Sequence, residues 1–217
     1  TYTITDNEDA PTIDFNSDSS SGAESVSSKD ITVNLSGPSS ETIIVDYAVT
    51  GTASGSGDDY TLVNGTLIID AGSTSGTITI ANIIDDNTDE TDETVIVTLS
   101  SPSNATLGSN DVHTYTIIDD DGMPAIEFNA NSSTAAEDIS SIVLTVDLSA
   151  ASSNNISVNY SVTGTATGGG TDYMLANGVL TINAGATSGT ITIDNIVDDL
   201  IDEDDETVII TLSGPSN

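Results

Sequence analysis

Two loops in this chain of 217 residues concentrate carboxylates. Residues 85–93 hold six Asp and Glu side chains, and residues 198–206 are at least as acidic. Runs rich in Val and Ile, which are typical of β-strands, flank both loops. Two carboxylates about 4 Å apart repel by roughly 1 kcal/mol in water, and by about 4 kcal/mol at an effective dielectric constant near 20. A loop pinned between two strands cannot separate its charges, so we expect both loops to attract cations.

The chain itself offers almost no cations. Lys29 is the only basic residue against 35 acidic ones, and the formal net charge is −34. Nucleic acid is excluded as a partner because phosphate binding rests on Lys and Arg, and an anionic membrane surface is disfavoured for the same reason. Two compatible interpretations remain: bound calcium, or an acidic surface adapted to high salt.

The composition otherwise describes a folded β protein. Hydrophobic residues make up 36% of the chain, so we do not expect disorder despite the charge. The absence of Cys excludes disulfides and thiolate metal sites. No apolar run reaches the length of a membrane span, so we expect no membrane insertion in this segment. Because the first residues already resemble mid-domain strand, we expect the sequence to be a window on a longer protein.

An internal repeat defines the domains. Residues 75–80 and 188–193 are both Ser-Gly-Thr-Ile-Thr-Ile, a separation of 113 residues. The same separation relates residues 1–4 to residues 114–117. A unit of this length suits one sandwich domain. The repeat therefore predicts the last strand and acidic tail of a preceding repeat (1–10), a complete domain (11–122) and a second domain lacking its last strand (123–217).

Apolar residues alternate with period two through the complete domain, as in strands with one buried face. Seven such runs are expected, centred near Ile13, Val33, Val45, Leu67, Ile78, Val97 and Tyr115. No stretch shows a helical period, and Gly-Pro and Asn-Gly pairs separate the runs. We therefore predict an all-β fold of tandem seven-stranded antiparallel β-sandwiches. The junctions are short and contain a stiffening proline, so we expect the domains to be arranged as a rod.

Calcium takes six to eight oxygen ligands from carboxylates, carbonyls and water. The complete domain offers carboxylates at several strand ends, which a sandwich can gather at one end: Glu24, Asp59, the 85–93 loop and residues 119–121. An EF-hand is excluded, because a loop that started at Asp85 would place Glu90 where that motif requires Gly. The alternative for each cluster is a solvated acidic turn or linker.

The order of motifs is specific. Both units carry an early Glu, then Tyr-x-Val-x-Gly-Thr-Ala, Asp-Tyr, Gly-x-Leu, Ala-Gly, Ile-x-Ile, Asp-Asp and Glu-Thr-Val, and the first ends on Asp-Asp-Asp. This succession resembles the Calx-β repeat, the calcium-sensing module of sodium–calcium exchangers that also occurs in large bacterial surface and adhesion proteins. The resemblance covers both units nearly end to end. It implies immunoglobulin-like sandwiches that bind several Ca²⁺ ions at the end facing the next domain.

Carried over position by position, the resemblance implies a ligand set in each unit. In the first unit the set is Glu24, Asp59, Asp85, Asp86, Glu90, Glu93, Asp119, Asp120 and Asp121, with the carbonyl of Thr88. In the second unit it is Glu137, Asp172, Asp198, Asp199, Glu203 and Glu206, with the carbonyl of Ile201. The counterpart of the terminal acidic run is absent from the second unit.

We expect a non-enzymatic, calcium-binding structural repeat of an extracellular surface protein, an adhesin stalk or fibre whose interdomain junctions Ca²⁺ rigidifies. Glycoside hydrolases also pair carboxylates, but these clusters recur in each repeat at junctions, where no catalytic cleft is expected. One alternative is an acidic halophilic spacer that does not need calcium. Another is a glycan- or protein-binding adhesion module, which the 4% aromatic content disfavours. His113 is expected at the surface.

The expected partners are neighbouring copies or repeats, arranged head to tail. By the repeat, Asn217 corresponds to Asn104 and Thr1 to Thr114. Either a longer array continues on both sides of this sequence, or residues 1–5 of one copy complete the last sandwich of another by strand complementation. In both cases Tyr2 and Ile4 would pack inside a neighbouring sandwich.

Overall fold

The computed structural model is an all-β protein. It describes residues 1–5, 7–199 and 204–216. The regular elements in this part are β-strands, and it holds no helix long and apolar enough to cross a membrane. The described chain forms two compact units, which take in residues 1–86 with 91–120 and residues 87–90 with 121–217.

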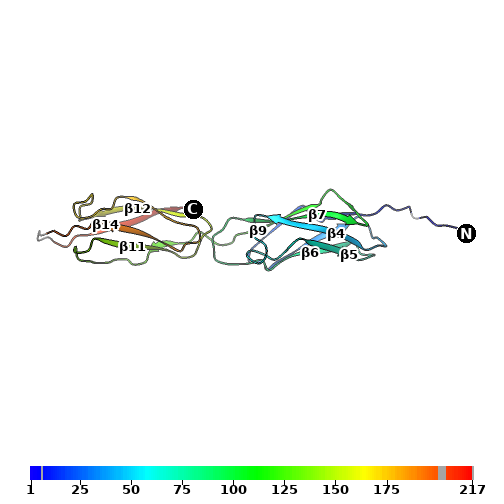
Figure 1. The fold of residues 1–217 in the computed structure, drawn as a ribbon, viewed down its shortest axis with the longest axis horizontal. Coiled ribbons are helices and arrows are strands. Elements are labelled where there is room, and N and C mark those ends of the chain that lie inside the picture. Colours follow the sequence, from blue (N-terminus) through cyan, green and yellow to red (C-terminus); the bar gives the residue numbers. More distant parts are fainter. Residues whose placement is uncertain (6, 200–203, 217) are drawn as a thin grey trace. The chain divides into compact units, whose positions relative to one another are not determined.

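The first unit is a sandwich of a 4-stranded and a 5-stranded sheet. Its strands are β1 (Thr12–Phe15), β2 (Ser19–Ala23), β3 (Ser28–Leu35), β4 (Ile43–Gly51), β5 (Gly65–Ile69), β6 (Ser75–Ala81), β7 (Glu93–Ser103), β8 (Thr106–Leu107) and β9 (Val112–Ile118). The smaller sheet has the order β6-β3-β1-β8 and the larger one β2-β9-β7-β4-β5. The long antiparallel pair β4 and β7 forms the middle of the larger sheet (Figure 1).

Period-two alternation builds the core between these sheets. Val95, Val97 and Leu99 of β7 are each at most 1% exposed, as are Ile43 and Val45 of the neighbouring β4. Their polar neighbours in sequence point the other way, since successive side chains in a strand face opposite sides. Each of the seven predicted runs forms a strand. The observed fold thus confirms the prediction of all-β, immunoglobulin-like sandwiches in tandem.

Two further strands, β2 and β8, differ from the prediction. Both pair in parallel, β2 with β9 and β8 with β1, so the sandwich is not entirely antiparallel. The sequence of β2 is Ser-Ser-Ser-Gly-Ala, which has no apolar alternation. Its backbone hydrogen bonds to β9, rather than a buried side-chain face, make it a strand. This parallel pair positions the candidate site described below.

β4 ends where it crosses the start of β7. Gly51 has φ +139°, and a Cβ added there would lie 2.0 Å from the carbonyl oxygen of Thr94. Thr94 is itself held, because its backbone N–H donates to Thr52 Oγ1 at 2.8 Å and its carbonyl accepts from the N–H of Ala53 at 3.1 Å. The first residue of β7, Glu93, directly precedes this fixed point.

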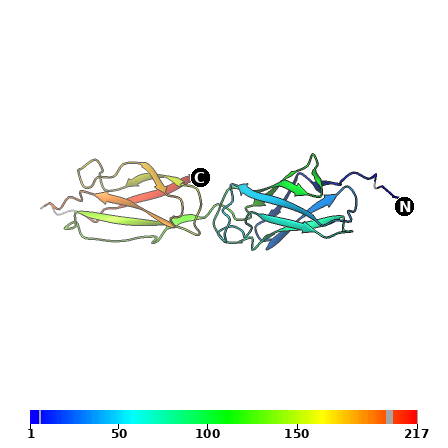
Figure 2. The same cartoon turned by 45° about the vertical axis from the view of Figure 1, so that its right-hand side comes forward.

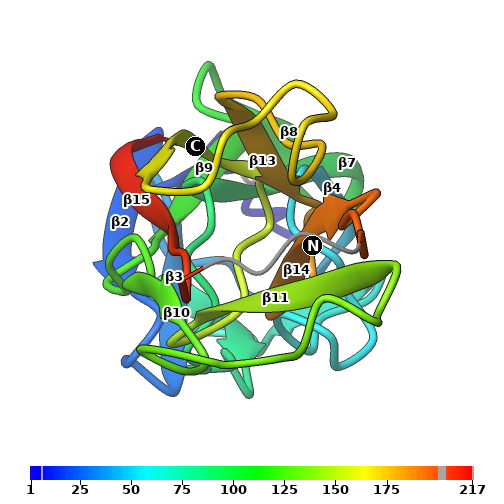
Figure 3. The same ribbon diagram turned by 90° about the vertical axis from the view of Figure 1, so that its left-hand side faces the viewer.

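The second unit contains two 3-stranded sheets. Its strands are β10 (Ile126–Phe128), β11 (Ser141–Leu148), β12 (Ile156–Gly164), β13 (Gly178–Ile182), β14 (Ser188–Asp194) and β15 (Val208–Ser216). One sheet has the order β10-β11-β14, which Figure 3 shows from the end, and the other has the order β13-β12-β15. Residues 132–136, which correspond to β2 by the repeat, form no strand.

Burial in the first unit overturns one sequence-based expectation and leaves a second one untested. His113 is buried, at 2% exposed, so its expected surface location is wrong. The reason is its place on β9, where His113, Tyr115 and Ile117 alternate toward the core. At the other extreme, Tyr2 and Ile4 are 91% and 88% exposed in the extended N-terminal segment (Figure 2).

Candidate calcium site

Glu24 is the central residue of the candidate site. It follows β2 directly and is 6% exposed. Its backbone N–H donates to the carbonyl of Ile118 at 3.0 Å, which extends the parallel register of β2 and β9 by one step beyond the pair Ala23 and Ile118. Because the two strands run in the same direction, both deliver their acidic residues to the same edge of the sheet. Glu24 therefore lies beside the acidic run that begins at Asp119.

Two groups of carboxylates meet at this edge. Glu24, Asp85 and Asp120 each contribute an oxygen, and these oxygens lie within 4.8 Å of one another. Glu24 forms a second such group with Asp119 and Asp121. Asp85 reaches the edge from the connection after β6, where the N–H of neighbouring Ile84 donates to the carbonyl of Asp59 at 2.9 Å and Ile83 is buried. Three separate connections thus converge on one place.

The spacing and chemistry of these oxygens suit calcium. Oxygens bound to one calcium ion at about 2.3–2.6 Å cannot be more than about 5 Å apart, and the observed groups meet that condition. The donor set consists of carboxylates, with no nitrogen or sulfur, which favours a hard cation over zinc or copper. Burial of Glu24 adds to the demand for a counter-charge, because a partly desolvated carboxylate is costly without one.

Sequence reasoning did not single out two neighbours of the group. Ser25 donates from its Oγ to Asp120 Oδ2 at 2.8 Å, and Asp92 Oδ1 accepts from the N–H of Asp119 at 3.3 Å. Both contacts orient the acidic run at the end of β9. Ser25 meets this run because β2 pairs in parallel with β9, and Asp92 meets it because β7 pairs with β9 so that Glu93 lies opposite Ile117.

Comparison with known proteins decides the family. The family model described as the Calx-beta domain matches residues 6–121 and 119–217. The chain belongs to the Calx-beta family. Calx-beta domains bind Ca²⁺, and the carboxylate groups around Glu24 contain oxygens of the kind that this ion takes as ligands. The family is one of binding and regulatory domains rather than enzymes.

Relatives of the chain include sodium/calcium exchangers. Sodium/calcium exchanger 3 of Mus musculus is 30% identical over 205 residues, which is 84% of this chain and 22% of the exchanger. Sodium/calcium exchanger 1 of Rattus norvegicus is 29% identical over 198 residues, which is 82% of this chain and 20% of the exchanger. The chain thus spans about a fifth of the length of these relatives. Among solved structures, the crystal structure of CBD12 from CALX1.2 has a TM-score of 0.48 at 24% identity, and the match covers 94% of this chain and 80% of that one.

Asp59 has a local task in the first Calx-beta domain. Its Oδ2 accepts a short hydrogen bond from the N–H of Ser54, and its own N–H donates to the carbonyl of Ser54 at 3.0 Å, which closes the loop after β4. Burial, and secondarily the Asp59 carboxylate, raise the pKa of the adjacent Tyr60, so that its hydroxyl stays protonated. Within the described residues, the two carboxylate groups do not include Asp59.

The remaining predicted ligands of the first domain are spread along the acidic loop. Asp86 is exposed, and Glu93 is half-buried at the start of β7. Thr88 and Glu90 belong to the segment 87–90, which the structure assigns to the second unit. In that segment Asp89, which the sequence did not single out, is 9% exposed and accepts from Ser152 Oγ at 2.9 Å. None of these four predicted ligands belongs to the carboxylate groups found among the described residues.

The second Calx-beta domain does not gather its acidic residues in the same way. The carboxylate of Asp172 accepts a hydrogen bond from the N–H of Thr167, as that of Asp59 does from the N–H of Ser54. The side chains of Glu137, Asp198, Asp199 and Glu206 are exposed, and Ile201 and Glu203 lie outside the described residues. No three carboxylates from the described part of this domain alone form a group like those around Glu24. In the first domain the parallel pairing of β2 with β9 brings Glu24 beside the acidic run, whereas residues 132–136, which precede Glu137, form no strand.

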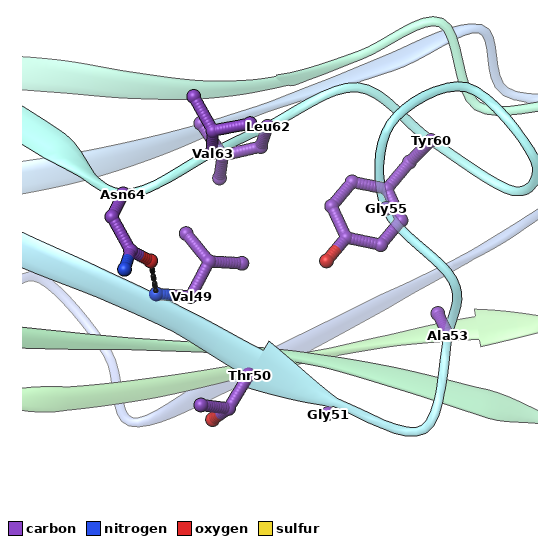
Figure 4. A pocket seen from close by; sticks show the side chains of 9 residues that line it. All are labelled: Val49, Thr50, Gly51, Ala53, Gly55, Tyr60, Leu62, Val63 and Asn64. Carbon is purple, nitrogen blue, oxygen red and sulfur yellow. Dashed lines mark hydrogen bonds between the residues drawn. The ribbon is translucent and has the colours of Figure 1, made fainter.

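The first unit also contains a hollow of about 470 Å³, which shares no residue with the two carboxylate groups around Glu24 (Figure 4). Asn64 closes one end, where its Oδ1 accepts from the N–H of Val49 at 2.8 Å, and Tyr60 stands at the other. The second domain repeats the Asn contact between Asn177 and Val162. The hollow is lined by Val49, Thr50, Gly51, Ala53, Gly55, Tyr60, Leu62, Val63 and Asn64. None of these residues is charged.

Proposed function

We propose that this chain is a calcium-binding structural repeat of an extracellular surface protein, such as an adhesin stalk or fibre, in which Ca²⁺ rigidifies the junctions between domains. The observation that carries the proposal is the convergence of Glu24, Asp85 and Asp120 on one edge of the first sandwich. Asp119 to Asp121 end the first domain immediately before the second begins, so a cation held by this run would stiffen the connection. A divalent ion would also offset carboxylate repulsion that the single Lys29 cannot offset.

Two arguments support the proposed location outside the cell: the net charge of the chain, and the weak calcium affinity that suffices for an extracellular module. A net charge of −34 keeps such a chain soluble and repels other anionic surfaces. Extracellular calcium modules work with dissociation constants of roughly 10⁻⁴–10⁻³ M, so a moderately organised site suffices there. The resemblance to repeats of large bacterial surface proteins points in the same direction.

We expect calcium to raise the melting temperature of the chain. At 100 times the dissociation constant, a ligand specific to the folded state stabilises it by about 2.7 kcal/mol, which corresponds to a rise of roughly 10 °C or more for a domain of this size. The measurement is calorimetric melting in CaCl₂ and in EDTA, together with the radius of gyration from small-angle scattering in both. Sodium chloride at matched ionic strength is the control, since an acidic halophilic spacer would respond equally to it. Equal melting temperatures and radii in calcium and chelator would refute the proposal.

The proposed partners are further copies or repeats of the same domain, joined through residues 1–5. Residues 1–4 have the sequence of residues 114–117, where Tyr115 is 1% and Ile117 6% exposed against β7. Tyr115 lies opposite Val95 in that pairing, and the counterpart of Val95 in the second unit is Val208 of β15. This supports strand complementation, in which the first residues of one repeat pair with a β15-type strand of its neighbour.

A peptide with the sequence of residues 1–9 is expected to bind a polypeptide of residues 11–217 in a 1:1 ratio and to raise the melting temperature of its second domain. Burying a large apolar side chain contributes about 1.5–3 kcal/mol, and the peptide would bury both Tyr2 and Ile4. Isothermal titration calorimetry measures the binding. The control peptide carries Tyr2→Ser and Ile4→Ser, which keeps the backbone and the charges. Equal binding of both peptides would contradict strand complementation.

A further inference from the structure

We infer that His113 is a positioning residue for the calcium site, acting at a distance through strand β2. This inference rests on the proposed calcium binding at Glu24 and concerns what places Glu24 there. His113 lies on β9, at the end of the strand away from the acidic run, and is 2% exposed. It packs beside Phe15 of β1, with the ring centroids 5.6 Å apart.

Both ring nitrogens of His113 form hydrogen bonds at the start of β2. Nδ1 lies 2.7 Å from the carbonyl oxygen of Ser17, and Nε2 lies 2.9 Å from Oγ of Ser20. A carbonyl can only accept, so Nδ1 carries the proton and donates. In the neutral ring Nε2 is then the acceptor, and the hydroxyl of Ser20 donates to it. One buried side chain therefore holds the connection before β2 and the second residue of β2 itself.

The backbone of β2 pairs with β9, but its side chains do little to fix the register of that pairing. Its five residues are serines, a glycine and an alanine, and it lies at the edge of its sheet, paired on one side with β9. Gly22 lies so close to Tyr115 that a Cβ there would be 2.5 Å from the tyrosine hydroxyl. An edge strand without an apolar face has a weakly specified register, since no buried side chains penalise a slip.

The register of β2 decides which side chain meets the acidic run. Ser19 lies opposite Thr114 and Ala23 opposite Ile118, so Glu24 comes beside Asp119. A slip by one residue would bring Ala23 or Ser25 to that place, and would turn the Glu24 carboxylate to the other face of the sheet. The hydrogen bonds of His113 with Ser17 and Ser20, at the other end of β2 from Glu24, oppose such a slip.

The test compares variants of the full 217-residue chain. His113→Leu keeps a buried apolar side chain but removes both hydrogen bonds, and Ser20→Ala removes one of them from the partly exposed strand with little effect on the core. We expect His113→Leu to raise the calcium dissociation constant about tenfold, the lower range for losing an orienting group behind a metal ligand, and Ser20→Ala to raise it by less. His113→Asn is expected to recover part of the affinity, because its amide can still donate to the carbonyl of Ser17.

Two measurements separate positioning from mere stability. Titration calorimetry with CaCl₂ gives the affinity, and hydrogen exchange of the amides of residues 19–24 in EDTA reports the register of β2 without calcium. The matched control is Thr79→Val, which removes the 2.6 Å hydrogen bond from Thr79 to Asp30 across β3 and β6 and should lower stability without changing affinity. Wild-type affinity and unchanged exchange in His113→Leu would overturn the inference alone. Absence of calcium binding in the unaltered chain would overturn the proposed function and the inference with it.

Discussion

Replacing Glu24 with glutamine is expected to weaken calcium binding by the first domain about 10- to 100-fold. Glu24 is the side chain shared by the two carboxylate groups, one with Asp85 and Asp120 and the other with Asp119 and Asp121. Charge-assisted contacts of a buried group contribute about 1.5–3 kcal/mol each, which converts to this range of affinity. Glutamine keeps the size of the side chain, but it removes the negative charge and replaces one carboxylate oxygen with an NH₂ group, which cannot bind a cation. Isothermal titration calorimetry with CaCl₂ measures the loss.

The same substitution should have the opposite effect on stability when calcium is removed. In EDTA the carboxylates of Glu24, Asp85 and Asp120 repel one another, by about 1–4 kcal/mol per close pair depending on the local dielectric constant. Glu24→Gln removes that repulsion, so the variant should melt above the unaltered chain in EDTA and below it in calcium. Asp70→Asn is the control, since it removes one charge from an exposed position after β5. A variant that melts lower in both conditions would contradict a cation-binding role for Glu24.

The second large effect is expected from Gly51→Ala, which should destabilise the first domain by at least about 3 kcal/mol. A side chain at φ +139° is strained by roughly 1–3 kcal/mol, and the added Cβ would lie 2.0 Å from the Thr94 carbonyl oxygen. Thr94 cannot move aside freely, because its N–H and its carbonyl are both hydrogen-bonded to the residues that follow Gly51. Calorimetric melting should show a decrease of roughly 10–20 °C for the first domain.

Two companion substitutions make this result specific. Gly37→Ala has open space around its Cβ and should change stability by no more than about 0.5 kcal/mol. Gly164→Ala repeats the geometry in the second domain, where a Cβ would lie 2.0 Å from the Thr207 carbonyl oxygen, and should lower the melting of that domain instead. If Gly51→Ala and Gly37→Ala melted at the same temperature, the close crossing of β4 and β7 would not exist in solution.

The strands of the sandwich were predictable because they bury one face. Val95, Val97 and Leu99 occupy every second position, and a β-strand is the local structure that places such residues on one buried face. The strand that matters most for the site was not predictable in this way. β2 consists of Ser-Ser-Ser-Gly-Ala, which reads as a loop, and its strand character comes from backbone pairing to a segment about 95 residues further along the chain. Long-range parallel pairing leaves no local signal.

The candidate site was predictable in kind but not in detail. Carboxylate density and the family resemblance pointed to Glu24, Asp85 and Asp120, whereas the contacts of Ser25 and Asp92 depend on tertiary geometry. Asp59 shows the converse difficulty, since its carboxylate closes a local loop five residues back, as Asp172 does in the second domain. His113 looked like a surface residue because a single histidine carries no periodic signal, although its alternation with Tyr115 and Ile117 was present in the sequence.

The parallel pairing of β2 with β9 has a consequence for the order of events during biosynthesis. Glu24 is made early and Asp120 nearly a hundred residues later, so no ion can be captured between them until the final strand of the domain has been synthesised and docked. If calcium binds as we propose, its uptake at this site therefore reports that the domain has finished folding, and a chain stalled before β9 keeps its acidic loops without this cation.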